Sequence, residues 1–332
     1  MELRSLLTWA ASWMTLKRVL NLFLLLVLAS CARTQIAAIA TPVVVISTKL
    51  IPTNTVLPPT PLPSITPTTE AHCDPFRADF CIIEGHFVLQ RPIHPPANDL
   101  VDETYLYAST ANGTREPHHG VEFPNKSGTP VYAAAEGKVI FAEPDKNAIY
   151  SPWQNFYGNL VVIQHKDELF TLYAHLSKID VKEGQQVFMG DKIGEVGRTG
   201  VAIGSHLHFE VRHGNAEDYF ATQNPELWLM PAKDSHGNFF GTLALYIVDK
   251  NHQLINYAEY TLRYDPNQAQ KLAKTYYGTT YSADMLSGNE NAVLGELSAG
   301  HYRLAVERNG KVYERWVEVE SGKLTQVVFI VK

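Results

Sequence analysis

Cysteine is scarce in this sequence, since 332 residues contain only three cysteines, at positions 31, 73 and 81. Three thiols allow at most one disulfide within the chain. Positive charge is also scarce: 28 lysines and arginines stand against 34 aspartates and glutamates, which gives a net charge of −6. Nucleic-acid-binding surfaces carry a basic cluster or stripe, and the sequence has none. We therefore expect no nucleic-acid partner.

A long amphipathic helical pattern is missing as well. Hydrophobic residues still make up 45% of the chain, which is typical of globular domains with real cores. In residues 71–231 they form short, β-branched runs between glycine turns, and these runs predict an antiparallel all-β domain. Similar runs in residues 232–332 predict a small β-sandwich that serves as an accessory domain. There, Asn309-Gly310 between two alternating runs predicts a β-hairpin.

The N-terminal segment "KRVLNLFLLLVLASC", residues 17–31, joins a basic pair, a short apolar run and small residues. The run is too short to span a bilayer comfortably, and the pattern is typical of a secretory signal. Its ending "LASC" resembles the bacterial lipobox, in which the signal is cut before a cysteine that becomes lipidated. Residues 1–30 are therefore predicted to be a lipoprotein signal peptide and Cys31 the lipidation site. A plain signal peptide or a transmembrane anchor is the alternative.

Lipidation of Cys31 would place the mature protein outside the cytoplasm, held at a membrane of the bacterial cell envelope. Residues 31–70 are rich in proline and threonine, which predicts an extended, semi-rigid tether. Cys73 and Cys81 then remain as a pair, and in an oxidising compartment two nearby cysteines predict a disulfide. The alternative is a thiolate metal site, for which His72 is the only obvious additional ligand.

The stretch "GSHLHFEVR", residues 204–212, places two histidines one residue apart in an alternating run. In a strand, side chains at i and i+2 point to one face, so His206 and His208 project together. Two adjacent imidazoles need polar partners in a core. They are well placed to hold a metal ion and to handle a proton beside it.

A second candidate segment contains His118 and Glu122 four residues apart, with Gly120 between them. An even separation puts both side chains on one face of an extended segment, and glycine allows a close backbone approach. Together with His208 they supply two imidazoles and one carboxylate. Such a set binds zinc and leaves a fourth position open for water. His175 and His206 would then support the metal or act in catalysis.

Three segments carry a family resemblance: "HHGVEFP", "LYAHLSKI" and "GSHLHFEVR". In this order, and over residues 115–213, the chain resembles the lysostaphin/LytM-type zinc metallopeptidases, which cleave peptide cross-links of bacterial peptidoglycan. The resemblance implies a groove-shaped antiparallel sheet with the metal on its floor. It also implies a zinc endopeptidase whose metal ligands are His118, Glu122 and His208. Its catalytic histidines would be His175 and His206.

The loop at residues 143–159 would form one wall of such a groove. Its aromatic residues either shape the cleft or pack in the core: Tyr150, Trp153, Phe156 and Tyr157.

Glu122 departs from the family pattern, which has aspartate at this position. Glutamate is longer by one carbon–carbon bond, about 1.5 Å, so the backbone or rotamer must adjust to seat the ion. The alternative hypothesis is a non-catalytic cell-wall-binding or hydrolase-activating protein with a degenerate site. Retention of every other motif position favours an active enzyme. An unrelated metal-storage or carbohydrate-binding β-protein fits the composition but not the ordered motifs.

Overall fold

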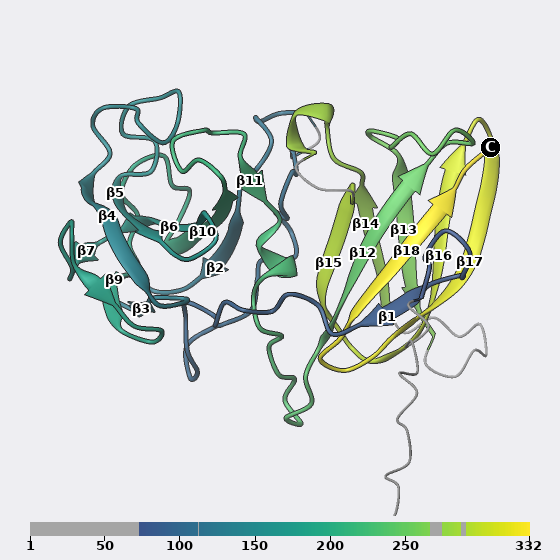
Figure 1. Cartoon of the computed structure of the whole chain (residues 1–332), viewed down its shortest axis with the longest axis horizontal. Coiled ribbons are helices and arrows are strands. Elements are labelled where there is room, and N and C mark those ends of the chain that lie inside the picture. The colour runs from purple at the N-terminus through teal and green to yellow at the C-terminus, as the bar shows by residue number, and fades with distance from the viewer. Residues whose placement is uncertain (1–72, 112, 266–273, 287–289) are drawn as a thin grey trace, which may run out of the picture. The chain divides into compact units, whose positions relative to one another are not determined.

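The computed structural model describes residues 73–111, 113–265, 274–286 and 290–332 (Figure 1). The predicted signal peptide, Cys31 and the tether lie outside the described residues. The described part belongs to one compact unit, Thr69–Lys332. It contains β-strands and the short 3-10 helices η1 (Pro225–Leu227) and η2 (Ala283–Met285), and no α-helix, so the prediction of an all-β protein is confirmed. Within it, no helix has the length and hydropathy needed to cross a bilayer.

The N-terminal lobe, comprising β2 to β11, is built on an antiparallel sheet of seven strands (Figure 1). The strand order is β11-β10-β6-β5-β4-β8, and β2 pairs with the first half of β10 on the edge opposite β6. The strands of this sheet are β2 (Val121–Pro124), β4 (Gly137–Pro144), β5 (Asn159–Gln164), β6 (Leu169–Leu176), β8 (Gln186–Val187), β10 (His206–His213) and β11 (Thr222–Gln223).

Two apolar cores cover the two faces of this sheet. Leu207, Phe209 and Val211 alternate along β10 and enter the larger core. A three-stranded sheet packs against that core and contains β3 (Pro130–Tyr132), β9 (Lys192–Glu195) and β7 (Lys178–Ile179). The opposite face has a smaller core around Leu172 and Ala174 of β6. Because both faces are covered, every residue of β6 is buried.

The C-terminal lobe, comprising β1 and β12 to β18, consists of two four-stranded sheets that share one apolar core (Figure 1). The first sheet contains β1 (Cys81–Ile83), β18 (Leu324–Ile330), β12 (Gly241–Val248) and β15 (Ala292–Leu297). The second contains β14 (Lys274–Thr279), β13 (Glu259–Tyr264), β16 (Gly300–Arg308) and β17 (Lys311–Val319). Asn309 and Gly310 have positive φ angles of 55° and 73° between β16 and β17. Both therefore suit a type I′ hairpin turn, and the predicted hairpin is confirmed.

Strand β1 differs from the predicted domain boundaries, which placed residues 71–231 in one domain. It pairs with β18 and so completes a sheet of the C-terminal lobe. A disulfide joins Cys73 to Cys81 at the start of β1, with Cα atoms 5.7 Å apart. Strand β18 would otherwise have an unpaired edge, and β1 supplies the hydrogen-bonding partner for it. The two strands are far apart in the sequence, so local sequence patterns do not predict this pairing.

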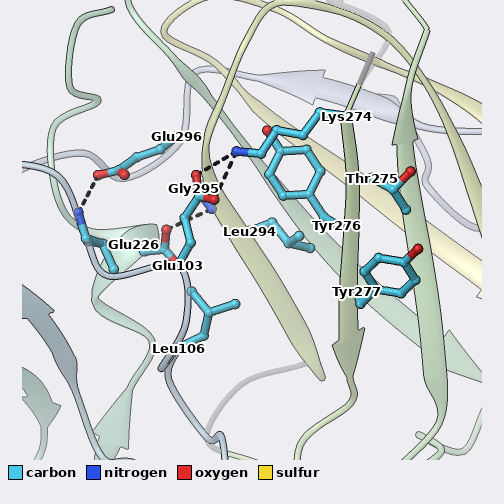
Figure 2. A pocket seen from close by; sticks show the side chains of 11 residues that line it. Glu103, Leu106, Glu226, Lys274, Thr275, Tyr276, Tyr277, Leu294, Gly295 and Glu296 are labelled. Carbon is cyan, nitrogen blue, oxygen red and sulfur yellow. Dashed lines mark hydrogen bonds and ion pairs between the residues drawn. The ribbon is translucent and has the colours of Figure 1, made fainter. Parts of the chain in front are cut away.

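Ionisable side chains with little exposure join the two lobes (Figure 2). Glu226 of η1 accepts a hydrogen bond from the backbone N–H of Gly295 in β15 at 2.8 Å. The Arg91 guanidinium contacts Glu296, whose carboxylate also accepts the Val101 N–H at 3.0 Å. A cavity of about 240 Å³ lies beside these groups. Gly295 has no room for a side chain, since a Cβ would lie 2.3 Å from Glu226 Oε1.

Candidate metal centre

Strands β2 and β10 bring the predicted metal-binding residues together. Glu122 pairs directly with His208 across these antiparallel strands. His118 lies just before β2, and Gly120 lets the backbone approach β10, because a Cβ there would lie 2.4 Å from the Phe209 carbonyl oxygen. One donor atom each from His118, Glu122 and His208 lies within 4.8 Å of the others. The three residues, selected from two separate segments of the sequence, therefore converge.

Hydrogen bonds define which ring nitrogen of each histidine is free. His118 Nδ1 lies 3.0 Å from the carbonyl oxygen of Tyr105 and 3.3 Å from that of Leu106. Carbonyls only accept, so Nδ1 carries the hydrogen and Nε2 keeps its lone pair. His208 Nε2 lies 3.0 Å from Glu210 Oε1. The carboxylate accepts that hydrogen, which leaves a lone pair on His208 Nδ1.

The two free nitrogens, His118 Nε2 and His208 Nδ1, lie 3.1 Å apart. Two lone pairs at this distance repel each other unless a proton or a cation lies between them. Burial lowers the pKa of His118 well below its usual value, and the nearby His208 lowers it further. A shared proton is therefore disfavoured, and the pair of nitrogens is suited to a metal cation.

The spacing of the donors is within a few tenths of an ångström of that in a zinc site. A tetrahedral zinc ion with bonds of about 2.0–2.2 Å holds its ligand atoms about 3.3–3.6 Å apart. The two histidine nitrogens are 3.1 Å apart, and Glu122 Oε1 lies 3.7 Å from His118 Nε2. The longer glutamate side chain thus still reaches the donor cluster.

His175 and His206 lie beside this cluster. Their ring centroids are 4.9 Å apart, and the His175 ring is 5.6 Å from that of His208. His175 Nδ1 donates to the carbonyl oxygen of Thr199 at 2.9 Å, so its Nε2 is free to accept a proton. Burial first, then the neighbouring His208, lowers the pKa of His175 to about 3 and that of His206 to about 4. Both rings are therefore neutral near pH 7.

A groove with a volume of about 760 Å³ runs over these histidines. Of the four aromatic residues predicted to shape a cleft or to pack, Trp153 and Phe156 line the groove. Tyr150 and Tyr157 are buried in the smaller core instead. Val201 and Ile203 add exposed apolar surface, at 67% and 78% exposure.

Three buried polar residues near the site were not identified from the sequence: His119, Glu210 and Arg212. The signal for two of them was present, because Glu210 and Arg212 continue the i+2 alternation that starts at His206 and His208. His119 stacks on Tyr219 with ring centroids 3.7 Å apart, and its Nε2 has no hydrogen-bond partner among the described residues.

The Glu210 carboxylate is ionised although it is buried. Burial raises the pKa of this group, but the Arg212 guanidinium and the hydrogen bond from His208 outweigh burial and lower it below its usual range. Glu210 therefore remains an acceptor for the His208 N–H, which keeps His208 Nδ1 free.

Residues 116–219 match the model of peptidase family M23. The matched residues include all three members of the donor cluster as well as His175 and His206. The resemblance predicted from the sequence motifs is therefore confirmed for this part of the N-terminal lobe.

Two curated relatives illustrate the match. Peptidoglycan DD-endopeptidase ShyA of Vibrio cholerae is 45% identical over 95 residues, which cover 29% of this chain and 20% of ShyA. The uncharacterized lipoprotein YgeR of Escherichia coli is 36% identical over 105 residues, which cover 32% of this chain and 37% of YgeR. The chain thus spans about a fifth of the length of ShyA.

Among solved structures, the catalytic domain of the antimicrobial peptidase lysostaphin from Staphylococcus simulans is similar to this chain. The sequence identity is 31%, and the match covers 38% of this chain and 88% of that domain with a TM-score of 0.32.

Proposed function

We propose that this protein is a zinc-dependent endopeptidase that hydrolyses peptide cross-links of bacterial peptidoglycan. The main support is the donor cluster, in which two ring nitrogens with free lone pairs and one carboxylate oxygen converge within 4.8 Å. His118 Nε2, Glu122 Oε1 and His208 Nδ1 would hold the ion. The names of relatives such as peptidoglycan DD-endopeptidase ShyA support the substrate class.

The chemistry that bound zinc supplies is polarisation of the scissile carbonyl and a lower pKa, near about 7, for a coordinated water. His175 is the better candidate for the general base, because its hydrogen is committed to Thr199 and its Nε2 can accept a proton. His206 would hydrogen-bond to the reacting carbonyl oxygen and steady the charge that develops there. Both rings are neutral near pH 7, which leaves one ring nitrogen of each able to accept and the other able to donate.

The groove would hold an extended peptide over the histidines. Trp153 and Phe156 give it an aromatic wall, and Val201 and Ile203 give it an apolar one. Arg115 and Glu116 add both signs of charge to its lining. This mixture suits a peptide that has apolar and charged groups.

The location of the protein remains a prediction from the sequence. We propose that residues 1–30 are removed as a signal, that Cys31 is lipidated, and that residues 31–70 tether the folded part to a membrane of the cell envelope. The similarity to the lipoprotein YgeR supports this proposal. The C-terminal lobe would act as an accessory domain.

A direct test combines metal analysis with a digest of purified peptidoglycan. The full chain purified with detergent is expected to contain one zinc ion per molecule and to release cross-link-cleaved fragments that mass spectrometry identifies. A non-catalytic cell-wall-binding protein with a degenerate site would be metal-free and would leave the cross-links intact.

A further inference from the structure

A buried ion pair lies directly behind the donor cluster. The side chains of Glu210 and Arg212 are both 0% exposed, and Arg212 Nε and Nη2 donate to Glu210 Oε2 at 2.8 and 2.7 Å. Removing two charges from water is costly, and an apolar pair of similar volume is often at least as stable. The ion pair therefore calls for an explanation other than stability.

The second carboxylate oxygen of Glu210 connects the ion pair to the donor cluster. Glu210 Oε1 accepts the N–H of His208 Nε2 at 3.0 Å and the hydroxyl of Tyr157 at 2.6 Å. Both oxygens of the carboxylate are thus used, one by Arg212 and one by His208 and Tyr157. An ionised carboxylate can only accept, so it selects the form of His208 in which Nδ1 is free.

Arg212 also fixes two segments that line the groove. Its Nη2 donates to the Tyr157 hydroxyl at 2.8 Å, and Tyr157 follows Phe156 of the groove wall. Its Nη1 donates to the carbonyl oxygens of Ala216 and Asp218 at 2.7 and 3.3 Å, next to Tyr219 of the groove. One guanidinium therefore connects both segments to the carboxylate that holds His208.

We propose that Glu210, Arg212 and Tyr157 are positioning residues, which hold His208 with its Nδ1 free for the metal. They also fix the position of the aromatic groove residues relative to His208. This inference rests on the proposed zinc site. Hydrogen bonds from a metal-binding histidine to a carboxylate set the ring orientation, and their loss typically weakens metal binding about 10–100-fold.

Glu210→Gln is the informative substitution. The amide oxygen of the new side chain would face the donors of Arg212, which turns its NH₂ group toward His208 Nε2. An NH₂ group only donates, so His208 would shift its hydrogen to Nδ1 and lose the free lone pair that faces His118. We expect the zinc dissociation constant to rise about 10–100-fold.

The experiment compares the full chain with its variants by zinc titration against a chelator. The ¹⁵N chemical shifts of His208 in the zinc-free protein report which ring nitrogen carries the hydrogen, a readout that a merely structural role would not change. Tyr157→Phe, which removes a single hydroxyl, is a second and milder variant in case Glu210→Gln fails to fold. We expect it to weaken zinc binding less than Glu210→Gln does.

Tyr302→Phe provides the matched control. Tyr302 is equally buried, and its hydroxyl donates to the Ser298 carbonyl at 2.7 Å in the C-terminal lobe. The Tyr302→Phe variant should leave the zinc affinity and the ¹⁵N chemical shifts of His208 unchanged. Folded Glu210→Gln and Tyr157→Phe proteins with wild-type affinity and wild-type His208 shifts would overturn the positioning role.

His208→Ala separates this inference from the proposed function. If that variant loses zinc while Glu210→Gln and Tyr157→Phe retain it, the metal site stands and the positioning role is wrong. If His208→Ala binds zinc as tightly as the wild type, the metal site itself is wrong.

Discussion

Glu122 lies directly opposite His208 in the antiparallel pair of β2 and β10, so backbone hydrogen bonds set the distance between carboxylate and imidazole. The register of the two strands leaves Glu122 Oε1 3.7 Å from His118 Nε2 and 3.4 Å from His206 Nε2. The Glu122 carboxylate therefore contacts both another metal-binding candidate, His118, and a catalytic candidate, His206.

Glu122→Gln should weaken zinc binding, because it keeps the length of the side chain and removes the negative charge. Loss of a supporting hydrogen bond already costs about 10–100-fold in metal affinity, so loss of an anionic ligand should cost at least about tenfold. Zinc titration against a chelator measures the change. Glu116→Gln, in the same groove, is the matched control and should bind zinc normally. Equal affinities for all three proteins would contradict a role for Glu122 as a ligand.

His206→Ala and His208→Ala should separate catalysis from metal binding. His206→Ala should leave the zinc content near normal while the cleavage rate falls by about 10²-fold or more, the usual cost of removing one hydrogen-bond donor to the developing oxyanion. His208→Ala should lose both zinc and activity, because it removes a ligand. Metal analysis and a peptidoglycan digest on the same preparations check this. Wild-type activity in His206→Ala would refute the hydrolytic assignment of this residue.

Glu226 should make the protein less stable as the pH rises. Burial, and secondly the neighbouring Glu296, raises the pKa of Glu226 from 4.5 to about 8 in the folded protein. The folded state then keeps a proton that the unfolded state releases. The stabilisation that comes from this bound proton is complete below pH 4.5 and is lost as the pH rises through 8. The free energy of unfolding should fall by at most about 1.4 kcal/mol per pH unit in this window.

Glu226→Gln is the control for this effect, since an amide does not titrate. Denaturant unfolding at pH 5, 6.5 and 8 should show a smaller decline for the variant than for the wild type. The other titrating groups contribute to both proteins and cancel in the difference. Parallel curves for the two proteins would show that Glu226 does not hold a proton in the fold.

The disulfide between Cys73 and Cys81 should stabilise the C-terminal lobe by holding β1 on the edge of β18. A cross-link that closes so short a loop lowers the entropy of the unfolded chain and raises the free energy of unfolding by about 2–3 kcal/mol. A double Cys73→Ser, Cys81→Ser variant should therefore unfold at lower denaturant concentration. Reduced wild-type protein should behave like the variant. An unchanged midpoint would mean that strand pairing alone holds β1.

Cys31→Ser should release the protein from membranes, because it removes the predicted site of lipidation. Fractionation of cells followed by immunodetection measures the distribution between membrane and soluble material. Thr34→Ser, outside the LASC motif, offers a conservative control. Retention of Cys31→Ser in the membrane fraction would point to a transmembrane tether.

Much of the site could be predicted because the relevant side chains follow local rules. The alternation of β10 puts His206 and His208 on one face wherever the strand lies. The same rule would have added Glu210 and Arg212, had the alternation been followed to the end of the strand. His119 could not be predicted in this way, since its burial depends on Tyr219 from a distant segment.

The sequence by itself determined the all-β architecture, the hairpin at Asn309-Gly310 and the shared face of the β10 histidines, because each depends on neighbouring residues only. The tertiary structure decided where His175 points. Regular alternation would place His175 on the face of Tyr173, in the larger core. A bulge in β6 adds one residue between the pairs Tyr173–Val161 and Leu176–Asn159, and His175 takes a φ of 61°.

This bulge turns the imidazole to the other face of the sheet, beside His206 and His208. A positive φ at a residue other than glycine costs free energy of about 1–3 kcal/mol, so only the surrounding strands and their register can maintain it. Local sequence rules contain no information about a partner strand. The position of the catalytic candidate was therefore decided by the assembled sheet.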